Sequence, residues 1–216
     1  MTERTLTNLS ELQAVNMMLT SIGEQVIKNL NDKAGLQDAS IANDILHNTS
    51  RQVQSRGWIF NTDLKVSLSP SNVDPNSTKG GKIAIGENTL RIDSVSKVRS
   101  NKKDIIERAG YLYDRENNTD LFTGAVEVDI VIFLPFGSLP EAARRYIAVK
   151  SSRIFHDRVV GSGELHNFFM MDEQQAWSDL LEYQSEVGDY TIFDDYDVFR
   201  VLDRHQDSNS HYSWRT

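Results

Sequence analysis

The chain has 216 residues, of which 39% are hydrophobic, and its formal net charge at pH 7 is −8. A chain of this length can bury one sizeable core or two small subdomains. The sequence contains no cysteine, which excludes a disulfide framework, a zinc–thiolate site and a catalytic thiol. The negative charge disfavours a free-standing nucleic-acid-binding protein, because affinity for duplexes comes mostly from Lys and Arg side chains that neutralise phosphates.

The sequence gives no sign of a membrane anchor. No apolar run approaches the roughly 20 residues that a membrane helix needs. The first residues, MTERTLTNLSE, lack the basic region and the apolar stretch of a signal peptide. We therefore expect a protein that is made and kept in a soluble compartment.

Two helices are predicted near the N-terminus. The first begins at Ser10, which forms a capping-box pattern with Gln13, and it ends at Gly23. The second is predicted over 37–56, with Gly57 as its stop. Their inner faces consist of Leu12, Val15, Leu19 and Ile22 in the first helix and of Ile41, Ile45, Thr49 and Val53 in the second.

The segment RQVQSRGWIFNTD, residues 51–63, is the most informative stretch of the chain. The predicted helix has a polar C-terminal end, which stops at Gly57, and Trp58 and Phe60 follow directly. Their two-residue spacing places both rings on one face of a predicted strand. This pattern indicates architecture rather than chemistry.

The middle of the chain is predicted to be a small antiparallel β region. Its first strand alternates apolar and polar residues and ends at Pro70, with Leu64, Val66 and Leu68 on one face. The stretch 69–82 is rich in Ser, Asn, Pro and Gly and is predicted to be a long surface loop. Further strands are predicted around 83–85, 90–92, 111–113 and 126–132, with a turn at 116–120.

The helical period returns at Pro140, which suits the first position of a helix. Gly161 and Gly163 separate this helix from a last long helix that ends at Gly188. The fold class is therefore α+β, a helical bundle formed by N- and C-terminal helices with an inserted antiparallel β region. The predicted division is into the N-terminal helices (1–57), the β region (58–136), the C-terminal helical hairpin (137–188) and a docking tail (189–216).

The two helices of the C-terminal hairpin have opposite charge. Segment 140–160 is basic, whereas 164–188 carries six acidic residues and no Lys or Arg. The last helix has a main apolar stripe and, one position round the helix, a second apolar set of Met170, Trp177 and Leu181. The stripe consists of Leu165, Phe168, Phe169, Ala176, Leu180, Tyr183 and Val187. One core cannot easily use so wide an apolar surface. We therefore predict a subunit interface formed by Arg144, Arg145, Arg153, Met170, Trp177 and Leu181. The alternative is a central helix that is buried on two sides within a monomer.

The C-terminal stretch 189–216 mixes aromatic and acidic residues without sustained periodicity, which is typical of a tail that docks on a partner. Its predicted docking anchors are Tyr190, Phe193, Tyr196 and Phe199.

The sequence assembles no convincing active site. None of the five histidines forms an HExxH-type ligand pair, and no GxSxG motif or P-loop occurs. The DDYD run at 194–197 can be read as a cation site or as a carboxylate pair for glycoside hydrolysis, but solvated turn residues explain it better. We expect no enzyme and no cofactor. The best local nucleic-acid candidate is a basic loop without interleaved aromatic residues, which is more often a solvated loop; it carries Lys97, Arg99, Lys102 and Lys103.

Four segments, in order, resemble the tail tubular protein A family of short-tailed, T7-like bacteriophages. They are ELQAVNMMLTSIGE (11–24), RQVQSRGWIFNTD (51–63), GYLYDRENNTDLF (110–122) and AVKSSRIFHDRVVG (148–161). The resemblance implies a head-to-tail adaptor, a dodecameric ring of identical subunits in the virion tail that is assembled in the host bacterial cytoplasm. Its implied partners are the portal protein, a tail nozzle of the tubular protein B type, and genomic DNA, which passes through the channel without sequence-specific binding.

Two other classes of function stay open at this point. One is a carbohydrate-active, tail-associated hydrolase that uses acidic residues, and the other is an α+β interaction module outside a virion.

Overall fold

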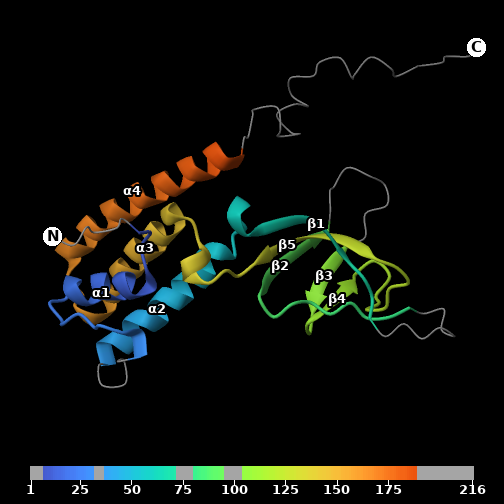
Figure 1. Cartoon of the computed structure of the whole chain (residues 1–216), viewed down its shortest axis with the longest axis horizontal. Helices are drawn as coiled ribbons and strands as arrows, with labels where there is room; N and C mark the ends of the chain where they lie inside the picture. The colour runs from blue at the N-terminus through green and yellow to red at the C-terminus, as the bar shows by residue number, and fades with distance from the viewer. Residues whose placement is uncertain (1–6, 32–36, 72–79, 95–103, 189–216) are drawn as a thin grey trace, which may run out of the picture.

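The computed structural model describes residues 7–31, 37–71, 80–94 and 104–188. Its described residues form two parts that lie side by side along the long axis, a group of four α-helices and a small β region (Figure 1). Each part has its own cluster of buried apolar side chains. The predicted α+β class, with a β region inserted between N- and C-terminal helices, is confirmed.

The N-terminal helices are α1 (Glu11–Ser21) and α2 (Gln37–Gln54). The predicted capping box is present at α1, because the Ser10 hydroxyl accepts from the Gln13 N–H at 3.2 Å and the Ser10 N–H donates to Gln13 Oε1 at 2.8 Å. Gly57 follows α2 with a φ of +78°, a conformation that favours glycine. The helix itself ends two residues before the predicted end.

The prediction that Trp58 and Phe60 begin a strand is wrong. Residues Ile59–Asn61 form a 3₁₀ turn, η2, and strand β1 (Thr62–Leu68) starts only after it. The cause is Asn61, whose side-chain oxygen accepts from the Trp58 N–H at 2.8 Å and so curls the chain. The two rings still lie together, stacked with centroids 6.2 Å apart.

The β region contains a three-stranded antiparallel sheet in the order β1-β5-β2, formed with β2 (Thr89–Ser94) and β5 (Val126–Ile132). A hairpin of β3 (Ile105–Arg108) and β4 (Tyr111–Asp114) lies beside it. The sequence did not predict β3, and the strand predicted at 83–85 is reduced to one isolated bridge, Ala84 to Tyr111. The alternation predicted for β1 also fails at Leu64, which is 70% exposed, because a bulge with Lys65 at a φ of +56° interrupts the register.

The chain returns from β5 through a 3₁₀ turn, η3 (Phe136–Ser138), to the C-terminal helices α3 (Glu141–Val159) and α4 (Gly163–Gly188). Pro140 is the N-cap of α3 rather than its first helical residue. Helix α3 packs against α1, α2 and α4 and so lies at the centre of the helical part. Among the described elements, helix α4 has substantial contact with α3 and η2 only.

Candidate functional site

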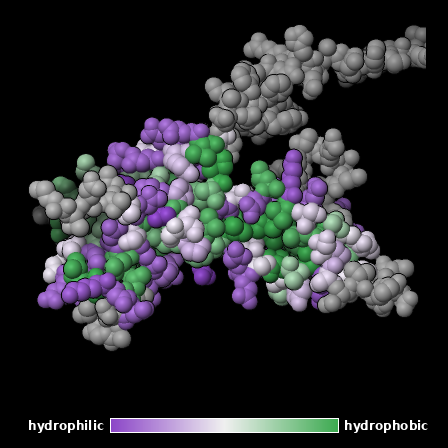
Figure 2. All heavy atoms as spheres, in the orientation of Figure 1, coloured by the Kyte–Doolittle hydropathy of each residue, from purple (hydrophilic) through white to green (hydrophobic). Residues whose placement is uncertain are grey.

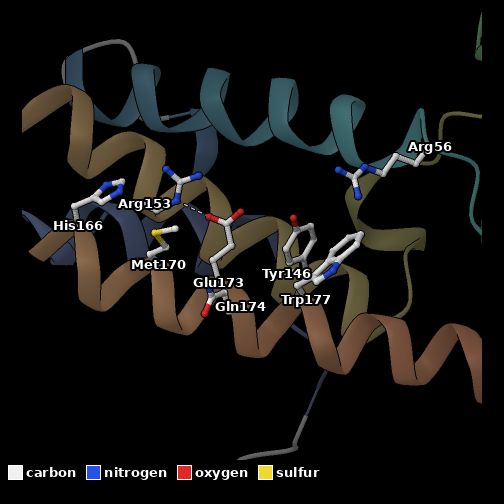
Figure 3. A pocket seen from close by; sticks show the side chains of 8 residues that line it. All are labelled: Arg56, Tyr146, Arg153, His166, Met170, Glu173, Gln174 and Trp177. Carbon is white, nitrogen blue, oxygen red and sulfur yellow. Dashed lines mark hydrogen bonds and ion pairs between the residues drawn. The ribbon is translucent and has the colours of Figure 1, made fainter.

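A cavity of about 420 Å³ lies on the surface of the helical part, between the end of α2 and helix α4, with α3 behind it (Figure 3). Helix α4 supplies most of its wall, α3 supplies two side chains, and Arg56 reaches it from the chain just after α2. The lining residues are Arg56, Tyr146, Arg153, His166, Met170, Glu173, Gln174 and Trp177.

Aromatic rings form one end of the cavity. The Trp177 ring lies 5.4 Å from the ring of Trp58 in an edge-to-face arrangement and 5.0 Å from the ring of Tyr146. The guanidinium of Arg56 lies over Trp177, 4.8 Å from the ring centroid. Burial raises the pKa of the Tyr146 hydroxyl, a group that is neutral near pH 7 even at its ordinary pKa of 10.0. Trp177 thus joins the RGWIF junction to the last helix.

The middle of the cavity holds an ion-pair network between α3 and α4. Arg153 Nε donates to Glu173 Oε2 at 2.5 Å, and Arg153 Nη1 donates to Asp157 at 3.2 Å. The hydrogen bond to Glu173 raises the pKa of Arg153. His166 Nδ1 lies 2.9 Å from Asp157 Oδ1. The opposite charges of the two helices are therefore paired here within one chain, so this pairing does not require a neighbouring subunit.

The network leaves an excess of positive charge beside the cavity. Both Glu173 and Asp157 bind Arg153. Neither Arg56 nor Lys150 forms an ion pair with any carboxylate in the part of the chain that the structure describes. The Lys150 amino group lies 5.6 Å from the Tyr146 ring, and burial lowers its pKa. Among the described residues, the three cations Arg56, Lys150 and Arg153 therefore face two carboxylates, and an anionic group could be attracted to the remaining positive charge.

The structure brings together three of the six predicted interface residues. Arg153, Met170 and Trp177 all line the cavity, and Leu181 lies one turn of α4 beyond Trp177, 43% exposed. Arg145 is exposed near the N-terminal end of α3.

Arg144 has a role within the chain. Its guanidinium donates to the backbone oxygens of Leu139, Leu9 and Gly137 at 2.7, 3.1 and 2.6 Å. It therefore ties the segment before α1 to the start of α3.

The sequence did not single out two further features of this surface. One is the pair Arg56 and Tyr146, which only the packing of α2, α3 and α4 brings to the cavity. The other is Phe168, which the main apolar stripe assigned to the core but which is 66% exposed, as is Met171. Of that stripe only Ala176 and Leu180 are buried, because α3 and η2 contact one side of a helix of 26 residues.

Several predicted functional residues lie outside the described residues. They are the tail anchors Tyr190, Phe193, Tyr196 and Phe199, the DDYD run at 194–197, and the basic residues Lys97, Arg99, Lys102 and Lys103. Within the described ranges, no three His, Asp or Glu side chains gather as they would to hold a metal ion. None of the described helices is both long enough and apolar enough to cross a membrane.

Comparison with known proteins agrees with the resemblance seen in the sequence. The chain is 26% identical over 162 residues to the tail tubular protein A of Klebsiella phage KP34, an alignment that covers 74% of this chain and 79% of that protein. The family model of tail tubular proteins matches residues 12–190. This range includes all the described strands and all the described helices, apart from the first residue of α1. The chain therefore belongs to the tail tubular protein family and is a structural protein of a phage tail.

Proposed function

We propose that this protein is the tail adaptor of a short-tailed phage. Identical subunits form a ring that joins the portal to the tail nozzle and forms part of the channel through which DNA leaves. The observation that carries this proposal is the exposure of large apolar side chains along α4, of which Phe168 and Met171 are each 66% exposed. Apolar side chains gathered on one helix are typical of a surface that another protein covers.

A ring of identical subunits needs two different complementary surfaces on each subunit. The predicted interface, Arg144, Arg145, Arg153, Met170, Trp177 and Leu181, supplies candidate residues for one of them. Met170 and Leu181 are the best-placed apolar residues of the six, because they are 46% and 43% exposed on α4. The family resemblance supplies the expected number of subunits, twelve.

The docking tail is the second part of the proposal. Residues 189–216 carry the aromatic anchors Tyr190, Phe193, Tyr196 and Phe199 between aspartates. We expect this segment to bind the portal or a neighbouring subunit, with the rings supplying apolar area and the carboxylates selecting a basic surface.

The net charge of −8 supports a conduit for DNA rather than a DNA-binding protein. A channel wall that bound phosphates tightly would hold back the DNA, whereas an acidic wall repels it. The protein would accordingly act in the virion tail, after assembly in the host bacterial cytoplasm, and would make no sequence-specific contact with the genome.

Purification with the phage's own portal protein tests this function. Native mass spectrometry and cryo-electron microscopy of the mixture should reveal a twelve-membered ring of this chain on the portal. A monomeric free protein is compatible with this function, since weak contacts between neighbouring subunits can need a scaffold to close a ring. A mixture in which the chain stays monomeric and unbound would refute the adaptor function.

We also propose that the protein has no catalytic turnover. A reducing-sugar assay on host capsule and on glucans should give no signal above background. Activity that Asp194→Asn or Asp195→Asn abolishes would instead support the hydrolase alternative.

A further inference from the structure

Helix α4 has two exposed edges of different chemistry. The first, which we name the acidic edge, carries Phe168, Met171, Asp172, Asp179, Glu182 and Glu186. The second, which we name the cavity edge, carries Met170, Gln174, Trp177 and Leu181. At 3.6 residues per turn, the two sets lie on roughly opposite sides of the helix. Ala176 and Leu180, which are buried against the core, lie between them.

The acidic edge is not neutralised by the residues that the structure describes. None of its four carboxylates forms an ion pair with a Lys, Arg or His side chain among residues that the structure describes. Asp179 accepts one hydrogen bond, from the amide of Gln175 at 2.8 Å, and the other three carboxylates lie on exposed residues. In the view of Figure 2, hydrophilic side chains lie along the middle of α4.

The cavity edge has the complementary chemistry. Met170 and Trp177 line the cavity together with Arg56, and Leu181 lies one turn of α4 beyond Trp177. Among the described residues, neither Arg56 nor the nearby Lys150 forms an ion pair with a carboxylate. The acidic edge likewise combines apolar side chains at its start, Phe168 and Met171, with carboxylates further along. Each edge therefore offers apolar area together with charge, and the charges are of opposite sign.

We propose that neighbouring copies of this chain associate by placing the acidic edge of α4 in one copy against the cavity edge of the next, so that Asp172, Glu182 and Glu186 neutralise Arg56 and Lys150. The inference rests on the proposed ring and identifies the two surfaces that build it. Because the surfaces lie on opposite sides of one helix, the contact is head-to-tail and leaves both edges available for the next copy. A self-complementary dimer would need both chemistries on the same face.

Charge reversal followed by charge exchange tests this pairing. One variant carries Asp172→Lys, Glu182→Lys and Glu186→Lys, a second carries Arg56→Glu and Lys150→Glu, and a third carries all five changes. In the first two variants like charges meet across the contact, so ring formation on the portal should fall at least about tenfold. In the third the charges are opposite again, and ring formation should recover.

The control variant carries Glu87→Lys, Glu116→Lys and Glu127→Lys, three exposed residues of the β region. It makes the same change in net charge as the first variant and should form rings as the unmodified chain does. Far-ultraviolet circular dichroism on each variant checks that the helices persist. If Arg56→Glu disturbs the contact with Trp177, Lys150→Glu alone replaces the second variant and is combined with the three lysine changes in the same way.

A carbodiimide cross-link gives an independent readout on the unmodified chain. Mixed rings of ¹⁵N-labelled and unlabelled subunits should yield peptides that join Lys150 of one copy to Asp172, Glu182 or Glu186 of another. The pairing is overturned if all variants form rings equally, or if the five-change variant assembles no better than the worse of its parents. If the unmodified chain forms rings but the five-change variant shows no recovery, this pairing alone is refuted. If the unmodified chain forms no ring on the portal, the proposed function is refuted as well.

Discussion

The side chain of Gln54 binds both backbone groups of Leu134: its Nε2 donates to the Leu134 oxygen at 3.0 Å and its Oε1 accepts from the Leu134 N–H at 2.8 Å. Gln54 ends α2, and Leu134 follows β5, so this pair ties the outgoing chain to the returning chain where the helical part meets the β region. Asn61 adds a second tie, because its Nδ2 donates to the backbone oxygens of Gln54 and Ile132 at 3.0 and 2.9 Å.

Replacement of Gln54 should therefore be costly. Gln54 is fully buried, and Gln54→Ala leaves both backbone groups of Leu134 without their partner. We expect the free energy of unfolding to fall by about 2–4 kcal/mol, measured by urea denaturation. Gln52→Ala, at an exposed position on the same helix, is the control and should change it by less than about 0.5 kcal/mol. Equal effects of the two changes would show that the tie to Leu134 contributes little.

Gly57 offers a test of the same junction through backbone conformation. Its φ is +78°, and a methyl group there would lie 2.7 Å from Nη2 of Arg91 and 3.1 Å from Cγ2 of Val131. Gly57→Ala should lower the free energy of unfolding by about 1–3 kcal/mol. Gly110 has the same φ of +78° but nothing within 4 Å of the added methyl, so Gly110→Ala measures the backbone cost alone. The close approach of Gly57 to the sheet contributes to stability only if Gly57→Ala lowers the free energy of unfolding more than Gly110→Ala does.

Much of the helical part could be predicted because its signals are local. The capping box of Ser10 and Gln13 and the stop at Gly57 need no knowledge of distant residues. The ties made by Gln54 and Asn61 could not be predicted in this way. A polar residue at or near a helix end is equally compatible with contact to solvent. The partner of Gln54, Leu134, lies 80 residues further along the chain, and the partner of Asn61, Ile132, lies 71 residues further.

The candidate site was predictable only in part, for a similar reason. The sequence indicated that the last two helices have opposite charge, but it did not say whether Arg153 meets an acidic residue of its own chain or of a neighbour. The answer depends on the register of the α3–α4 hairpin, which sets Arg153 beside Glu173. Arg56 entered the cavity only through the packing of α2 on α3.

Substitutions of Trp177 and Phe168 should distinguish the contribution of α4 to the stability of the subunit from its contribution to assembly. Trp177 packs against Trp58 and Tyr146, so Trp177→Ala should lower the free energy of unfolding by about 2–3 kcal/mol. Phe168 is exposed, and Phe168→Ala should change this free energy by less than about 0.5 kcal/mol while it weakens assembly on the portal. Thermal unfolding and native mass spectrometry measure the two effects. Normal assembly by a stable Phe168→Ala variant would remove Phe168 from the interface.

The pair of Lys82 and Asp120 predicts a pH dependence in the β region. The Lys82 amino group lies 2.6 Å from Asp120 Oδ2, and this hydrogen bond lowers the pKa of the Asp120 carboxyl below its ordinary value. The stabilisation is fully present above the unfolded pKa of about 4 and is lost as the pH falls through the lower folded value. Carbon-detected NMR titration of the Asp120 carboxyl should give a midpoint below the ordinary value of 3.8, and Lys82→Met should raise it. A midpoint that Lys82→Met leaves unchanged would mean that the pair does not persist in solution.

His156 is a buried polar side chain whose replacement should not harm the fold. It is 1% exposed on α3, its ring centroid lies 5.0 Å from that of Phe169, and neither ring nitrogen has a hydrogen-bond partner among the described residues. Because an unpaired polar group costs free energy when it is buried, His156→Leu should leave the free energy of unfolding unchanged or raise it by about 1 kcal/mol. Phe155→Leu, at the fully buried neighbouring position, is the matched control and should lower it by about 1–2 kcal/mol, because it removes only apolar volume. Urea denaturation of both variants at pH 7.5 makes the comparison. A loss of more than about 2 kcal/mol in His156→Leu would mean that the imidazole contributes hydrogen bonds to the packing of α3 against α4.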